Sequence, residues 1–153
     1  MENKPMTQAQ RDMQLAALKR EYRKKSNEIA RIKVEAERNK MSGIQLTDLE
    51  YRQKRKHLLE VLLDLRFKRS KIDEGTQEYL SFSDNIRRTE HQLSILKDKW
   101  CSDRQEIRTS FYFKRTSLDE ESRKLTEWFE FEKYKIMYEF EKSNHDDKDS
   151  ILD

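Results

Sequence analysis

An apolar residue recurs at every seventh position through the middle of the chain, and this repeat constrains the fold more than any other feature. The residues that follow it without a miss are Ile44, Tyr51, Leu58, Leu65, Ile72, Tyr79, Ile86, Leu93, Trp100 and Ile107. A seven-residue period places these side chains in one stripe along a slightly under-wound helix, which is the seam of a coiled coil. The repeat therefore predicts long helices that pair lengthwise.

The positions three residues further on, which would complete such a seam, are mostly polar. Only Val61, Phe82 and Leu96 among them are apolar. A seam filled at half of its positions would hold a separate partner weakly. We therefore interpret the stripe as an internal spine on which the two ends of the chain fold.

The composition also favours thin helical packing. Charged residues make up 41% of the chain and hydrophobic residues 34%, whereas charged residues are about 25% of a usual globular domain. With one proline and two glycines, the chain has too few breakers for the turns of a many-stranded β fold. The composition and the small number of breakers therefore predict an all-α fold.

We predict an elongated, antiparallel helical hairpin or coiled-coil bundle. It consists of a flexible N-terminus at 1–6, one helical domain at 7–142 and an acidic, disordered tail at 143–153. Within the domain, the pattern indicates three helices, at about 7–40, 47–110 and 118–142.

Two turns separate the predicted helices. Met41-Ser42-Gly43 interrupts the first apolar pattern, and residues 47–50 have the composition of a capping box, so we expect a turn at 41–46. After Ile107 the repeat shifts by four residues, and residues 117–120 form a second capping box, which predicts a turn at 112–117.

Gly75 raises an alternative for the central helix. Glycine costs about 1 kcal/mol in a helix interior, and Thr76 could cap a new helix. Because Ile72 and Tyr79 keep the seven-residue register across it, we expect the helix to continue. If Gly75 breaks the helix instead, four helices would form an antiparallel bundle.

Charge is distributed unevenly along the chain. Residues 1–71 hold 19 Lys and Arg against 10 Asp and Glu, a net charge of +9, whereas residues 117–153 hold 6 against 12, a net charge of −6. Such asymmetry favours antiparallel return of the chain or head-to-tail association. Cys101 is the only cysteine, so we expect a reducing, cytoplasmic setting, and no apolar run is long enough to predict membrane insertion.

No combination of residues predicts an enzyme. The histidines are His57, His91 and His145, none at the spacing of helical zinc ligands, and there is no glycine-rich loop for phosphate. No nucleophile, base and pocket can be assembled from the pattern. We expect no catalytic residues, no metal, no cofactor and no small-molecule substrate.

The last predicted helix is apolar on more than one side. Leu125, Trp128, Phe129, Ile136 and Phe140 make one stripe, and Phe131, Tyr134 and Tyr138 lie outside it. Since aromatic side chains carry much of the energy of interfaces, we predict a partner-binding surface at Trp128, Phe131, Tyr134 and Tyr138. The alternative is that this helix is buried between the other helices of its own chain.

Basic runs within residues 19–71 form a second candidate surface. Its residues are Lys19, Arg20, Arg23, Lys24, Lys25, Arg52, Lys54, Arg55 and Lys56. They could bind nucleic-acid phosphates. The alternative is a solvated face that pairs with acidic segments.

These features predict a non-enzymatic helical adaptor, assembly factor or scaffold that binds proteins through its aromatic C-terminal helix, with homodimerisation as the default association. The first alternative is a basic, nucleic-acid-associated helical protein. In length, charge and helical plan the chain also resembles the stalk components of bacterial type III export machines, which sit inside a rotary ATPase. That resemblance implies a stalk-like role as a further alternative.

Overall fold

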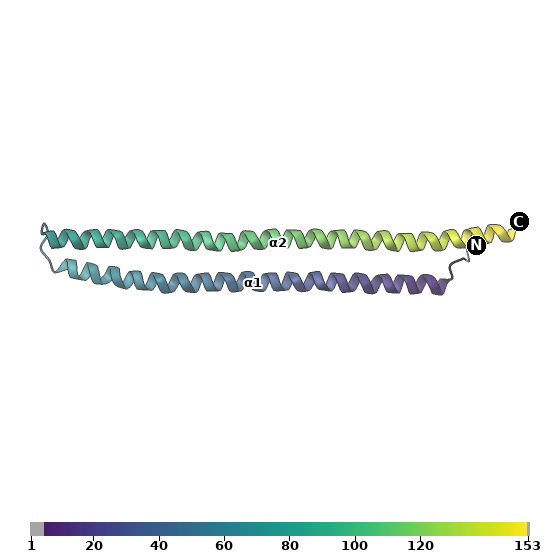
Figure 1. Ribbon diagram of the computed structural model, residues 1–153, viewed down its shortest axis with the longest axis horizontal. Coiled ribbons are helices and arrows are strands. Elements are labelled where there is room, and N and C mark those ends of the chain that lie inside the picture. The colour runs from purple at the N-terminus through teal and green to yellow at the C-terminus, as the bar shows by residue number, and fades with distance from the viewer. Residues whose placement is uncertain (1–4, 153) are drawn as a thin grey trace. The chain divides into compact units, whose positions relative to one another are not determined.

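The computed structural model of the chain describes residues 5–152, with side chains up to residue 144. Two helices account for nearly all of them: α1, Gln8–Ser70, and α2, Gln77–Leu152. A turn at 71–76 joins the two helices and reverses the chain direction, and residues 5–152 contain no strand (Figure 1). The all-α class is confirmed, whereas the predicted division into three or four helices is wrong.

The turn between the helices is built around Gly75. Its φ is +88°, a left-handed conformation that L side chains rarely adopt. Thr76 then caps α2, because its hydroxyl oxygen accepts a hydrogen bond from the Tyr79 amide at 3.2 Å and donates one to the Asp73 carbonyl at 2.9 Å. The predicted continuity through Gly75 is therefore wrong, since the chain reverses there.

The first helix begins at Gln8, close to the predicted start at about 7, whereas the last helix continues beyond the predicted end at about 142. At the N-terminus Thr7 and Gln10 form a reciprocal capping box, with the Gln10 amide donating to the Thr7 hydroxyl at 3.1 Å and the Thr7 amide donating to the Gln10 side chain at 2.9 Å. Residues 1–4 of the predicted flexible segment lie outside the described residues. The backbone of α2 is helical to Leu152, through the segment predicted as a tail, and the side chains from 145 onward lie outside the described part.

The predicted turn at 41–46 is wrong because Gly43 is a packing residue. It lies inside α1, where a Cβ would approach Cδ1 of Ile107 to 3.4 Å. Gly43 therefore faces the Ile107 side chain of α2, at a distance where a methyl group would make an ordinary packing contact. A single glycine lowers the stability of a long helix by only about 1 kcal/mol. The packing of α1 against α2 before and after residue 43 offsets this loss.

The predicted turn at 112–117 is also wrong, since α2 continues through it. Phe111 is half-buried, with the Lys40 Nζ 4.1 Å from its ring centroid, and Leu118 is buried. The four-residue shift of the repeat is thus accommodated within a continuous helix, as coiled-coil stutters are.

The chain divides into two compact units, and each contains a segment of both helices. Unit 1 comprises Met1–Ala36 and Lys114–Asp153, and unit 2 comprises Glu37–Phe113. In unit 2 the stripe pairs with itself: its members on α1 pack against its members on α2, as the rings of Tyr51 and Trp100 show with centroids 4.5 Å apart. The stripe is not a continuous spine covered by the chain ends, because it folds back at Gly75.

A polar cluster interrupts the seam of unit 2. Trp100 Nε1 donates a hydrogen bond to Asp48 Oδ1 at 2.7 Å, and an Arg104 guanidinium nitrogen lies 3.5 Å from the same oxygen. Arg104 Nε is buried and has no acceptor within the described part of the chain. Since partly buried polar groups are tolerated only where their partners align, this cluster favours one register of α1 against α2.

Unit 1 is a second antiparallel pairing of α1 with α2. Leu18, Ala36 and Leu118 are buried in its seam. The rings of Tyr22 and Phe129 stack with centroids 4.5 Å apart. Aromatic and aliphatic side chains thus hold the two segments together along one side of each helix.

The two glycines provide a matched test of this architecture. We expect Gly43→Ala to raise the free energy of unfolding by up to about 1 kcal/mol, because alanine favours helix and its methyl group would meet the Ile107 side chain at ordinary van der Waals distances, 3.4 to 3.9 Å. We expect Gly75→Ala to lower it by about 1 kcal/mol, because φ is positive there. Urea denaturation followed by circular dichroism measures the free energy of unfolding of both variants. If Gly43→Ala lowered this free energy, the result would contradict a helical conformation at residue 43.

Candidate functional site

An exposed aromatic row on α2 of unit 1 is the leading candidate surface. Phe131, Tyr134 and Tyr138 are 65%, 73% and 56% exposed. Their spacings of three and four residues place them on one side of the helix. Trp128, the fourth predicted residue, is half-buried at the edge of this row, with the Lys25 Nζ 4.7 Å from its ring centroid.

The opposite side of the same helix is already occupied. Phe129 stacks on Tyr22, and the Arg11 guanidinium carbon lies 4.4 Å from the ring centroid of Phe140. Leu125 and Ile136 are half-buried on this side as well. Within unit 1, therefore, one apolar stripe of α2 packs on α1 and the other faces solvent, so the helix is not buried between two neighbours of its own unit.

Ion pairs precede the aromatic row along α2. Arg123 Nε donates a hydrogen bond to Glu120 at 3.1 Å, and Arg123 also pairs with Glu127. These hydrogen bonds hold the pKa of Glu120 below its ordinary value and raise the pKa of Arg123. The hydrogen bond from Lys33, whose Nζ lies 2.7 Å from Asp119, lowers the pKa of that carboxyl and joins α1 to α2.

The predicted basic residues fall into both units. Lys19, Arg20, Arg23, Lys24 and Lys25 lie in unit 1, and Arg52, Lys54, Arg55 and Lys56 lie in unit 2. Lys25 is engaged by Glu21, 3.2 Å away, as well as by Trp128.

The structure brings Arg52, Arg55 and Lys56 together along one side of α1 in unit 2. No carboxylate of the described residues pairs with any of these three cations. Lys54 instead lines a different groove, between α1 and α2, with Ile95 and Leu96.

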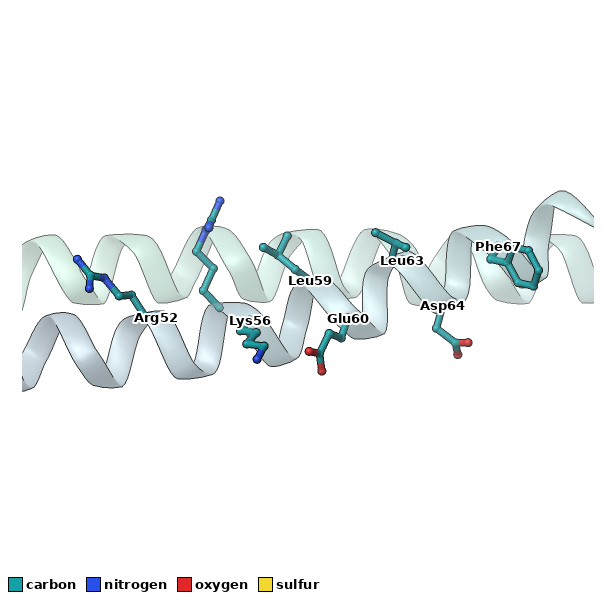
Figure 2. Close-up of a pocket in the computed structure, with 8 residues that line it drawn as sticks. Arg52, Lys56, Leu59, Glu60, Leu63, Asp64 and Phe67 are labelled. Carbon is teal, nitrogen blue, oxygen red and sulfur yellow. The ribbon is translucent and has the colours of Figure 1, made fainter.

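A second exposed apolar row, on α1 of unit 2, was not identified from the sequence. Half-buried Leu59 and exposed Leu63 and Phe67 follow one another along an open groove that the three cations also line, while Glu60 and Asp64 project on the same side as Lys56 (Figure 2). Leu63 is 73% exposed and Phe67 59%. The spacing of four residues from Leu59 through Leu63 to Phe67 is the signal in the sequence that could have identified this row.

Comparisons with known proteins do not identify a family. No family model, curated protein or solved structure matches the chain. No helix within residues 5–152 is long and apolar enough to cross a membrane. Among the described side chains, no group of three or more His, Cys, Asp or Glu could hold a metal ion, and Cys101 is exposed.

Neighbouring leucines test whether the exposed row of unit 2 is free of the core. We expect Leu62→Ala to lower the free energy of unfolding by about 2–4 kcal/mol, because Leu62 is buried in the seam. We expect Leu63→Ala to change it by about 0.5 kcal/mol or less, because that side chain is already in water. Urea denaturation measures the free energy of unfolding of both variants. If the two substitutions lowered it equally, Leu63 would also pack in the core.

Proposed function

We propose that the protein is a non-enzymatic helical adaptor or scaffold that binds another protein chain through Phe131, Tyr134 and Tyr138. The observation that carries this proposal is the exposure of three large aromatic side chains in one row, on a helix whose other side is already packed. Large aromatic residues lose less conformational entropy than flexible side chains and contribute strongly to interfaces. A row of this spacing suits a helix or a groove lying along α2.

The charged surroundings support binding of a partner in a defined orientation. Glu127 and Glu141 border the row, and Lys124 lies one turn before Glu127. All three side chains are exposed. Charges at the border of an interface steer association and disfavour incorrect orientations.

Site-specific photo-cross-linking in cells tests this proposal. A photoreactive residue in place of Tyr134 should form covalent adducts with a protein, whereas the same residue in place of Lys133, which is exposed on another side of the helix, should not. Adding Phe131→Ser and Tyr138→Ser should abolish the adducts while leaving the helical content unchanged. Equal adduct formation at 134 and 133, or none at 134, would contradict the proposed surface.

The basic side of α1 supports nucleic-acid association as a second candidate function. Arg52, Arg55 and Lys56 are exposed and make no ion pair with the described residues. Cations without carboxylate partners are free to bind phosphates. The apolar row beside them fits a protein partner better, so we rank this function second.

Salt dependence measures the contribution of these cations. If the three side chains bind three phosphates, the affinity for a DNA or RNA duplex should fall by about 40-fold between 50 and 200 mM salt. Reversing all three charges to glutamate should remove this dependence, whereas reversing the exposed Lys97 on α2 should not. Absence of binding at the lower salt concentration would exclude the second function.

A stalk-like role in an export machine is compatible with the first proposal, because it also depends on protein binding. The observation that favours it is the hairpin of two long helices, which is the plan on which the resemblance rests.

A further inference from the structure

The aromatic row belongs to a longer row along α2 that has the spacing of a coiled-coil seam. Its members are Lys124, Glu127, Phe131, Tyr134, Tyr138 and Glu141. The steps between them alternate between three and four residues, which keeps all six side chains on one side of the helix. Every one of them is exposed. We call this set the outer seam, and the inference drawn from it rests on the proposed binding function.

The outer seam lacks a partner helix within its own unit. The other side of α2 packs on α1, through the stacking of Phe129 on Tyr22 and the hydrogen bond between Lys33 and Asp119. Its six residues extend over about 27 Å of helix. A second helix could therefore lie along this length without displacing the packing of α2 on α1, and Glu127, which pairs with Arg123 of its own helix, is the one residue of the described seam already engaged in an ion pair.

If that helix came from a second copy of the chain, the charged residues of the outer seam would determine whether it lies parallel or antiparallel to α2. In a parallel pair, each seam residue meets its own counterpart. Lys124 would then face Lys124 of the other copy, and Glu127 and Glu141 would each face a glutamate. All three charged layers would be repulsive, so the outer seam disfavours a parallel partner.

An antiparallel pair reverses this outcome. With the two-fold axis midway between Phe131 and Tyr134, Phe131 of each copy meets Tyr134 of the other. Tyr138 then meets Glu127, to which its hydroxyl can donate a hydrogen bond, and Lys124 meets Glu141. Each of these contacts occurs twice, because the interface is symmetric. The like-charge contacts are replaced by ion pairs at both ends of an aromatic centre.

We propose that the outer seam binds a second copy of this chain in antiparallel orientation, with Lys124 of each copy paired to Glu141 of the other. Because Lys124 stands at one end of the seam and Glu141 at the other, the terminal charges are complementary in the antiparallel orientation and repulsive in the parallel one. The aromatic centre supplies the buried contacts, and the terminal ion pairs select the register.

A charge exchange tests both the partner and the orientation. We expect K124E and E141K each to weaken self-association by about tenfold or more, because each places like charges at both ends of the interface. The double variant K124E/E141K restores opposite charges and should return the dissociation constant to within about threefold of the original protein. Analytical ultracentrifugation measures the constants, and circular dichroism checks that the variants remain helical.

The matched control is K133E/E139K, which exchanges two exposed charges of the same helix outside the outer seam. It should leave the dissociation constant unchanged. A double variant K124E/E141K no tighter than the single ones would overturn the antiparallel register. A monomeric original protein at every concentration would overturn self-association.

The photo-cross-linking experiment separates that result from failure of the proposed function. If the original protein is monomeric but the residue at 134 forms an adduct with a different protein, the binding surface stands and the second copy is excluded. If the residue at 134 forms no adduct and the protein is monomeric, both proposals fail.

Discussion

Lengthwise packing of α1 against α2 is the interaction on which everything else in this protein depends. Each helix is strongly charged, and neither has a second neighbour within its unit, so one narrow seam supplies the apolar burial of both. No side chain in the described part of the chain is fully buried. Stability must therefore come from many partial contacts, including stacked rings such as Tyr51 on Trp100 and cations that lie over aromatic faces.

A seam of this kind leaves most of each helix in contact with water, and this has functional consequences. A helix in a thicker bundle would hide a second apolar stripe, whereas here such a stripe remains available. Phe131, Tyr134 and Tyr138 in unit 1 and Leu63 and Phe67 in unit 2 are exposed for this reason. Exposed apolar rows of this spacing suit partner helices.

The helical class and the location of the aromatic row could both be predicted from residue spacing, because helical periodicity is a local property. The turns could not. Gly43 and Gly75 are equivalent in the sequence, yet Gly43 lies inside a helix and faces Ile107, whereas Gly75 adopts a positive φ in the turn. The seven-residue spacing of the apolar stripe continues unchanged through the turn. The spacing therefore could not indicate that the chain reverses there. The capping-box patterns failed as well, since residues 47–50 lie inside α1 and residues 117–120 lie inside α2.

The sequence by itself determined that the chain forms long amphipathic helices, which side chains form the main stripe and where the second, aromatic row lies. The tertiary structure alone decided that the stripe pairs with itself and that the aromatic row stays exposed. The physical reason is that periodicity defines the faces of a helix, whereas the partner of each face depends on where the backbone reverses. In this protein that point is the left-handed conformation of one glycine, Gly75.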